Sequence, residues 1–363
     1  MNRLITLFLL LVLCSCQDTT EDIFTDNFDR RAMLTNWVDN IIVPAHEIYD
    51  VRLQALRLSK DEFIIEGSTL TFENLRLAYK NAYLAWQAVS MFDIGKAEEI
   101  GLRNFSNIYP TDTQLIEENI QGGNYNLELP SNFDAQGFPA LDYLLFGLSD
   151  NDDEIINILQ QTAYSSYLNE LVDRLKLLNL EVLNDWRIPF RSEFIENDGS
   201  SATASTDKLV NDFLFYYEKF LRAGKIGIPA GVFSGNEIPT SVEAPYSGIY
   251  SKELFFAAYK AVQDFFKGLN YDGSQDGSSL EDYLNYVATE NGTSSLADPI
   301  LAQWTIAEAK VQALDDSFRS QVENDNIKML EAYDELQKAV VLLKVDMLQA
   351  LNIQVDFVDA DGD

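Results

Sequence analysis

Gly137, Pro139 and Asp142 have the spacing of a small reactive site, Gly-x-Pro-x-x-Asp, within QGFPALDYLLFG at residues 136–147. A histidine at the middle position would place two ligating side chains on one side of a first helical turn, which suits a metal or a substrate. Proline has no side-chain ligand atom, but its fixed φ and missing N–H suit the start of a helix. Three interpretations stay open: a helix start with an acidic first turn, a ligand pocket into which Asp142 points, or a working catalytic site.

A second segment, KIGIPAGVFSGNEIPTSVEAPYSG at residues 225–248, is rich in glycine and proline. A long non-helical crossing inside a helical protein is uncommon and tends to be functional, although a structural strap between helices is an equal alternative. We predict that it faces Asp142 across a pocket, with Lys225 as the charge partner of that acid. The polar candidates of the segment are Lys225, Ser234, Glu243, Tyr246 and Ser247.

Few residues remain for other metal or nucleophile chemistry. The chain has one histidine and two cysteines, and His46 follows an apolar run on an expected helix, so we interpret it as a packing residue. A site built only from carboxylates, with Asp142 as one ligand, suits a hard cation such as iron or calcium. The runs at 272–277 and 359–363 resemble parts of a calcium loop, but neither has the glutamate that such a loop needs at position twelve, and we expect a solvated turn and tail.

The N-terminus, MNRLITLFLLLVLCSC, has the features of a lipoprotein signal peptide. Arg3 precedes an apolar run at 4–13 that is too short to span a bilayer comfortably, and Ser15 precedes Cys16 as in a bacterial lipobox. We predict that residues 1–15 are removed, that Cys16 carries the lipid, and that residues 16–27 form an acidic tether. Gln17 resembles the residue that follows the cysteine in outer-membrane lipoproteins, so we expect an outer-membrane lipoprotein of the bacterial envelope, facing the periplasm or the surface, with the lipid anchor as its membrane contact.

The charge balance argues against nucleic acid as a partner. Lysine and arginine total 26 against 58 acidic residues, which gives a formal net charge of −32. Such a charge repels phosphate backbones. The hydrophobic share of 47% supplies ample material for a buried core.

Apolar residues recur at steps of three and four along most of the chain, which predicts helices with one buried face. The clearest stripes cover 75–89, 164–182 and 329–350, and shorter pieces cover 29–58, 209–222, 252–266 and 296–322. No series of alternating strands is visible, so we predict an all-α fold. The turn-rich run at 148–154 divides it into two helical bundles packed together, an N-terminal one at 28–155 and a C-terminal one at 156–363 that contains the irregular glycine- and proline-rich segment.

These segments together resemble the imelysin family, whose members are also called imelysin-like or iron-regulated envelope proteins and are classed with a peptidase family. The resemblance extends over nearly the whole mature chain. It implies an all-helical fold of two bundles with the site at their interface. It rests on WVDNIIVPAHEIY at 37–49, AYKNAYLAWQAVSMF at 78–92, GFPALDYLLFG at 137–147 and the segment at 225–248.

The named motif of this family is Gly-x-His-x-x-Glu, and the present chain departs from it at two positions. Gly137 matches, Pro139 stands in place of the histidine, and Asp142 stands in place of the glutamate. The resemblance implies either a non-catalytic lipoprotein that binds a ligand or a metal, associated with the iron or haem uptake machinery of the envelope, or an imelysin-type peptidase with an altered metal centre. The loss of the histidine favours the binding protein over the enzyme.

Overall fold

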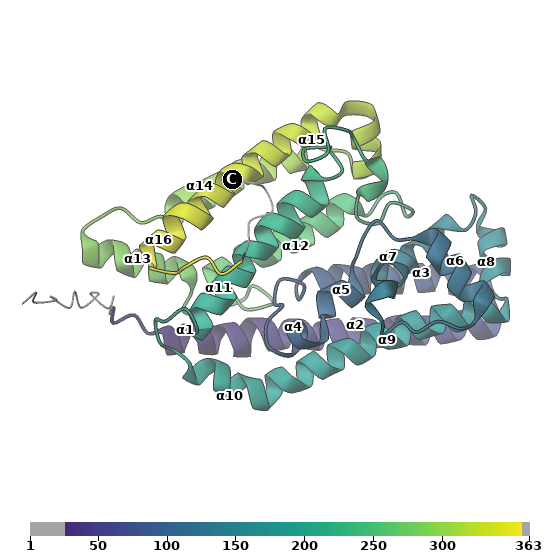
Figure 1. Ribbon diagram of the computed structural model, residues 1–363, viewed down its shortest axis with the longest axis horizontal. Coiled ribbons are helices and arrows are strands. Elements are labelled where there is room, and N and C mark those ends of the chain that lie inside the picture. The colour runs from purple at the N-terminus through teal and green to yellow at the C-terminus, as the bar shows by residue number, and fades with distance from the viewer. Residues whose placement is uncertain (1–25, 358–363) are drawn as a thin grey trace, which may run out of the picture.

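The computed structural model describes residues 26–357, and the regular elements in this range are helices (Figure 1). The only β-pairing in that range is an isolated bridge between Leu269 and Asp276. The all-α prediction is therefore confirmed. Up to residue 187 the helices are α1 (Arg30–Asn36), η1 (Trp37–Ile42), α2 (Val43–Glu66), α3 (Thr69–Gln87), α4 (Lys96–Ile100), α5 (Leu102–Ser106), α6 (Thr113–Gly122), η2 (Pro130–Ala135), α7 (Gly137–Asp142), η3 (Tyr143–Gly147), α8 (Asp152–Leu159) and α9 (Thr162–Arg187).

The second half of the chain continues in the same way. Its helices are α10 (Pro189–Glu196), α11 (Ser205–Phe215), η4 (Tyr216–Gly227), η5 (Pro239–Ser241), α12 (Ser251–Lys267), α13 (Leu280–Asn291), α14 (Ala297–Gln312), α15 (Phe318–Val341), η6 (Leu342–Met347) and α16 (Leu348–Ala350). The predicted signal peptide, Cys16, most of the tether and the acidic run at 359–363 lie outside the described residues.

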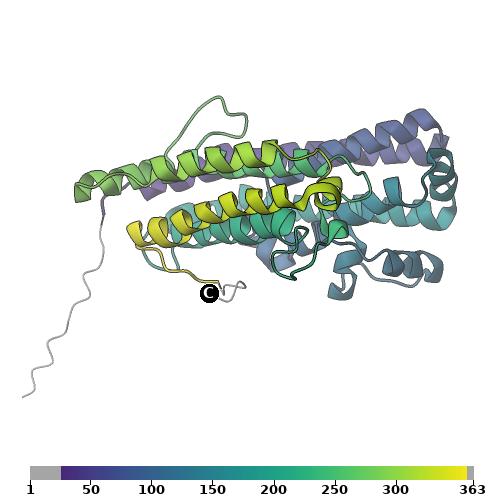
Figure 2. The same ribbon diagram turned by 90° about the horizontal axis from the view of Figure 1, so that it is seen from above.

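Three long helices, α2, α3 and α9, pack side by side (Figures 1 and 2). Gly67 ends α2 in the left-handed conformation, and a reciprocal capping box between Ser68 and Thr71 starts α3. These signals explain the sharp reversal between the two helices. The apolar stripe predicted along α3 faces the core, with Leu75, Tyr79 and Trp86 buried.

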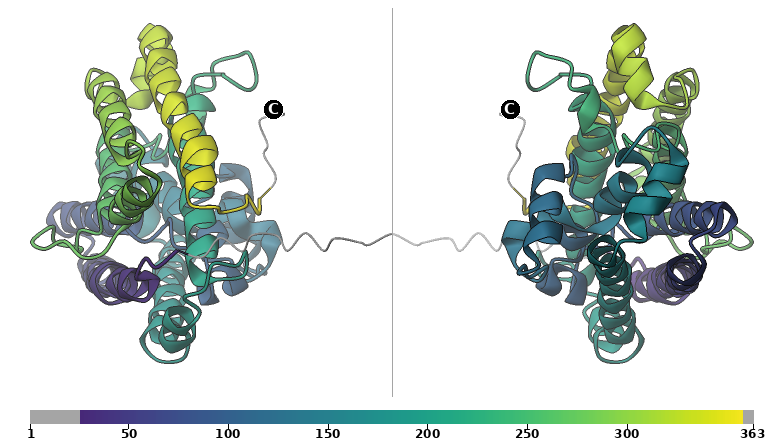
Figure 3. Two further views of the ribbon diagram at one scale, coloured as in Figure 1. Left: turned by 90° about the vertical axis from the view of Figure 1, so that its left-hand side faces the viewer. Right: turned by 90° about the vertical axis from the view of Figure 1, so that its right-hand side faces the viewer.

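Helices α14 and α15 lie on the opposite side of the molecule from α2 and α9, as the end-on views show (Figure 3). Between them, α12 packs against α3 and against η4. The elements η1, η3, η4 and η6 are π-helical and continue the preceding α-helices without a break. Such wide turns are rare, and two of them, η3 and η4, adjoin the candidate site.

The buried apolar side chains form one contiguous core that includes residues from both halves of the chain. The predicted boundary between residues 155 and 156 lies inside α8, and α9 packs along α2. The division into two bundles stays a prediction. None of the helices in the described range is both long and apolar enough to cross a membrane.

One predicted helix is interrupted. The pattern at 296–322 predicts a continuous helical piece, but α14 ends at Gln312 and α15 begins at Phe318. The side chain of Ser317 accepts a hydrogen bond from the backbone N–H of Ser320, which caps a new helix start. The prediction was wrong here because the apolar period continues across the turn, where Leu314 is buried between the two helices.

Candidate functional site

Gly137 begins α7 in a place that only glycine can occupy. Its φ is +73°, and a Cβ atom there would lie 2.2 Å from the backbone oxygen of Ser106. Both the conformation and the close approach exclude a side chain. The glycine of the predicted motif therefore has a structural role, which is to bring α7 against the end of α5.

Pro139 lies in the first turn of α7 and is buried. The preceding residue, Phe138, stacks on the ring of Tyr83 with the centroids 4.4 Å apart. Trp86 also packs against Phe138, with the centroids 6.3 Å apart. The turn that contains the position of the missing histidine is thus packed into an aromatic part of the core. Pro139 offers no atom that could bind a metal.

Asp142 is fully buried and bound to the 225–248 segment through that segment's backbone. Its Oδ2 accepts a hydrogen bond of 2.7 Å from the N–H of Tyr246, and its Oδ1 accepts one of 3.2 Å from the N–H of Ser247. The hydroxyl of Tyr79 donates a longer bond of 3.4 Å to Oδ1. Burial raises the pKa of Asp142 to about 7, and the two amides oppose this rise.

Lys225 does not pair with Asp142, so that part of the prediction was wrong. Its ammonium forms an ion pair with Glu243 and donates a 2.9 Å hydrogen bond to Oε1 of Gln87. The side chains of Lys225 and Glu243 are 3% and 1% exposed. Burial lowers the pKa of Lys225, whereas the carboxylate opposes this shift. The reason for the error is local: η4 continues through Gly227, so Lys225 still lies on a helix and faces α3.

Glu243 is the centre of a closed polar network. Its Oε1 accepts hydrogen bonds from Nε2 of Gln87 at 3.1 Å and from Nδ2 of Asn107 at 2.8 Å. The hydroxyl of Tyr83 completes the network with a 2.7 Å bond to Oδ1 of Asn107. Sequence reasoning missed Gln87, although an amide four residues after Tyr83 on an otherwise apolar stripe was a usable signal.

The cavity beside this network is very small. Gln87, Asn107 and Lys225 line it, and its volume is about 10 Å³. Such a space accommodates about one water molecule. The predicted juxtaposition of α7 and the 225–248 segment is present at another place, where Asp142 bonds directly to the backbone amides of Tyr246 and Ser247. The pocket expected between them stays a prediction.

The other predicted residues of the segment have different positions. The ring of Tyr246 packs on Tyr143 with the centroids 5.3 Å apart, and the hydroxyl of Ser247 donates to the backbone oxygen of Ala244 at 3.1 Å. Ser234 is exposed and donates to the backbone oxygen of Asn236 at 2.7 Å. The network around Glu243 therefore includes the side chains of Lys225 and Glu243. The backbone amides of Tyr246 and Ser247 bind Asp142 instead, and Ser234 lies apart from both acids.

The residues at the motif do not fit a resident metal. Both oxygens of Asp142 accept hydrogen bonds from backbone N–H groups, and the carboxylate of Glu243 is paired with an ammonium. Within residues 26–357, no three His, Cys, Asp or Glu side chains are grouped so that they could hold a metal ion. His46 is buried, with Nδ1 2.8 Å from Oδ1 of Asn179, and burial lowers its pKa to about 4. A packing role fits that environment.

The family model for imelysin matches residues 42–343. The chain belongs to the imelysin family. Solved structures that share its fold include the following two. One is described as an iron-regulated protein A precursor from Parabacteroides distasonis, with a TM-score of 0.71, 17% identity, and coverage of 88% of this chain and 95% of the other. The second is an imelysin-like protein from Psychrobacter arcticum, with a TM-score of 0.68, 17% identity, and coverage of 90% and 97%. No curated protein matches the chain.

Replacing Asp142 by asparagine is expected to remove a pH dependence of stability. Its pKa rises from the ordinary 3.8 to about 7 on folding, so the native protein holds a proton that the unfolded chain releases between these values. The contribution of Asp142 to the free energy of unfolding is therefore complete below the unfolded pKa of 3.8. It decreases as the pH rises above that value and is lost once the pH has passed about 7. The total loss is at most about 4 kcal/mol. Urea unfolding at a series of pH values from about 4 to about 8 measures this slope.

The control for this series is Asp150→Asn, which makes the same change of charge at an exposed position. We expect it to keep the slope of the wild type. An Asp142→Asn protein whose unfolding free energy follows pH as steeply as the wild type would contradict the assignment.

The Lys225–Glu243 pair gives a second expectation. Lys225→Met leaves the carboxylate of Glu243 buried without its cation, which should lower the free energy of unfolding by about 3–5 kcal/mol. Adding Glu243→Gln to the same chain should restore part of the loss, because a neutral amide needs no counter-charge. Lys328→Met, which removes a pair at an exposed position, should change stability by no more than about 1 kcal/mol. Urea unfolding of the four proteins tests this, and equal losses for Lys225→Met and Lys328→Met would contradict it.

Proposed function

We propose that this chain is an exported, lipid-anchored envelope protein that takes part in iron or haem uptake by binding, and that it does not cleave peptide bonds. One observation carries the second half of the proposal. Asp142 is 0% exposed and both of its oxygens accept backbone hydrogen bonds. Hydrolysis of a peptide needs a base or a metal that reaches both a water molecule and the scissile bond, and neither is available at this motif.

The motif residues instead hold parts of the chain together. Gly137 admits the close approach of α7 to α5, and Asp142 ties α7 to the backbone at residues 246 and 247. The geometry is that of a structural junction built where the family has its named motif. A protein that retains the fold while using the motif for packing can still bind a ligand elsewhere on its surface.

The cellular part of the proposal is supported by the N-terminus and by the relatives. Residues 1–16 have the order of a lipoprotein signal, with a basic residue, an apolar run and a small residue before Cys16. One similar solved structure is described as an iron-regulated precursor. Where the described chain begins, Asp26 forms a 2.6 Å ion pair with Arg30, and Phe28 stacks on Tyr283. A tether from Cys16 would thus join the folded part beside α13.

A proteolysis assay tests the non-catalytic part. The mature protein is incubated with unfolded protein substrates and Zn²⁺, with and without a chelator. We expect no chelator-sensitive cleavage, because Pro139 cannot ligate and no second histidine is present in the chain. Cleavage that is lost in Asp142→Asn but kept in Asp150→Asn, with both variants folded, would reverse the proposal in favour of a peptidase with an altered centre.

The envelope part is tested in the source bacterium. A strain without the gene is complemented with the wild type, Cys14→Ser or Cys16→Ser, and grown with labelled fatty acid under iron limitation. We expect the label in the first two proteins and not in Cys16→Ser, and we expect iron uptake to fall in the deletion strain and recover with the wild type. Label in Cys16→Ser would contradict the anchor, and unchanged iron uptake in the deletion strain would contradict the link to iron.

A further inference from the structure

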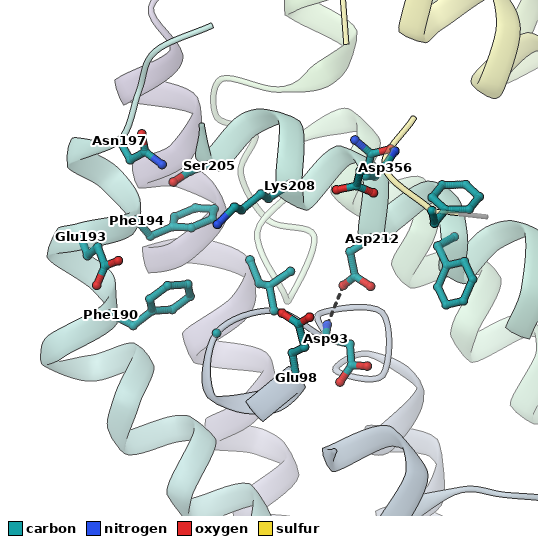
Figure 4. A pocket seen from close by; sticks show the side chains of 15 residues that line it. Asp93, Glu98, Phe190, Glu193, Phe194, Asn197, Ser205, Lys208, Asp212 and Asp356 are labelled. Atoms are coloured by element: carbon teal, nitrogen blue, oxygen red, sulfur yellow. Dashed lines mark hydrogen bonds between the residues drawn. The ribbon is translucent and has the colours of Figure 1, made fainter. Parts of the chain in front are cut away.

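An acidic cavity of about 440 Å³ lies where α10 and α11 meet the loop before α4 (Figure 4). Its inner carboxylates already have partners within the fold. Asp212 accepts a hydrogen bond of 2.6 Å from the N–H of Asp93 and one of 3.2 Å from Arg103, which also lies 3.4 Å from Oδ2 of Asp93. The guanidinium thus serves both acids, and nothing in this cavity points to a ligand. The outer surface of α2 is different, because its apolar side chains are open to solvent.

Helix α2 carries a second apolar face on the side that points away from the core. Its core face is buried through Leu53, Leu56 and Phe63. On the other side, apolar residues recur at steps of three and four with one acid among them, which is the spacing of the a and d positions of a coiled coil. The members of this outer stripe are Ile48, Val51, Ala55, Leu58, Glu62 and Ile65.

The outer stripe has no cover within the described chain. Val51, Leu58 and Ile65, which lie seven residues apart, are 58%, 56% and 82% exposed. In the end-on views, α2 lies at the edge of the molecule (Figure 3). Soluble monomers rarely expose a long contiguous apolar surface, and such a surface marks an interaction site.

Exposed leucines on α3 widen this surface. Because α2 and α3 run antiparallel from a tight turn, Leu70 and Leu77 lie across from Ile65 and Leu58, and both leucines are exposed. The 24 residues of α2 make a helix about 36 Å long, and two helices about 10 Å apart form a face of roughly 700 Å². A standard interface buries about 800 Å² on each partner. The two-helix face therefore has about the size that a stable dimer requires.

The acids on one edge of the outer stripe are matched within the molecule. Glu47 forms an ion pair of 2.6 Å with Arg187 on α9, and Asp61 forms one of 2.9 Å with Lys60. Their charges are therefore offset before any partner arrives.

The charges on the other edge are complementary to each other. Arg52 and Glu66 are both exposed, and neither forms an ion pair with a residue in the range 26–357. If two copies of α2 pack antiparallel about a two-fold axis at Leu58, Val51 of one copy lies opposite Ile65 of the other, because both are seven residues from the axis. Arg52 then lies beside Glu66 of the second copy, and symmetry repeats the pair. The stripe and its edge thus complement themselves, as a symmetric interface requires.

We propose that the chain forms a two-fold symmetric homodimer through the outer face of α2 and α3, with the two α2 helices antiparallel and Leu58 at the axis. The net charge of −32 opposes association, but charges more than about 8 Å apart are screened at physiological ionic strength. Glu62, the acid of the stripe, lies near Ala55 of the second copy, where the small side chain leaves the carboxylate access to water. The inference goes beyond the proposed function, because it does not depend on a ligand, on cleavage or on the lipid anchor.

Crosslinking at the axis tests the geometry. The two cysteines of the chain are Cys14 and Cys16, so the mature chain with Cys16→Ser has no thiol of its own. Adding Leu58→Cys should give a disulfide-linked dimer on mild oxidation, because the two-fold axis brings the introduced thiols together. The control is Ile327→Cys, which is similarly exposed on α15 at the opposite side of the molecule and should remain monomeric in denaturing electrophoresis without reductant.

Sedimentation equilibrium of the mature Cys16→Ser chain at physiological salt measures the dissociation constant of the dimer. Leu58→Glu should raise it at least tenfold, because two carboxylates would meet in an apolar seam. Arg52→Glu should raise it severalfold by placing like charges together, and Arg52→Glu/Glu66→Arg should restore it. Ile327→Glu, which adds the same charge outside the face, should leave it unchanged.

Three results would overturn the proposal: a monomer at every concentration in the series, equal dissociation constants in Leu58→Glu and Ile327→Glu, or equal crosslinking in Leu58→Cys and Ile327→Cys. A monomer that binds vesicles of neutral lipid, and loses this binding in Leu58→Glu, would assign the face to a membrane instead. Thermal unfolding of each variant shows that it is folded. The iron-uptake and proteolysis tests do not involve this face, so the two proposals can fail separately.

Discussion

Two buried carboxylates determine how the 225–248 segment lies on the helices. Asp142 and Glu243 are both almost wholly removed from water, and a buried acid must find donors or remain neutral. Asp142 takes its donors from the backbone at residues 246 and 247, and Glu243 takes its donors from Lys225, Gln87 and Asn107. Each acid therefore joins an early part of the chain to a late one, and the irregular backbone between residues 228 and 250 is held by these two connections.

The same connections explain how the backbone conformation of the imelysin motif can be kept while its histidine and glutamate side chains are replaced. The left-handed φ at position 137 and the close approach of the Ser106 backbone require glycine there, whichever residues occupy the other motif positions. At the next motif position, proline fits a first helical turn as well as any residue does. An aspartate can then accept the amide bonds that orient the segment. The glycine conformation, the proline and the hydrogen bonds to the aspartate thus maintain the backbone geometry without a bound metal.

Much of the fold could be predicted from periodicity, and much of the site could not. The stripe at 75–89 predicted α3 because each apolar step lies on one face. The partner of Lys225 could not be predicted, since the choice between Asp142 and Glu243 depends on how far η4 continues. The contact between Asp93 and Asp212 could not be predicted for a related reason: the two residues are 119 positions apart in the chain. Only packing brings them together.

The buried Lys225–Glu243 pair also constrains how this sequence can change over generations. If the lysine is replaced first, the intermediate protein has the carboxylate of Glu243 buried without a cation. If the glutamate is replaced first, the intermediate has the ammonium of Lys225 buried without an anion. Both intermediates are less stable than either end point, so the two positions are expected to be inherited as a unit. Drift is freer at Ser234, which is exposed and bonded only to its own loop. The same irregular segment therefore contains two positions that should change together, Lys225 and Glu243, and one that can change alone, Ser234.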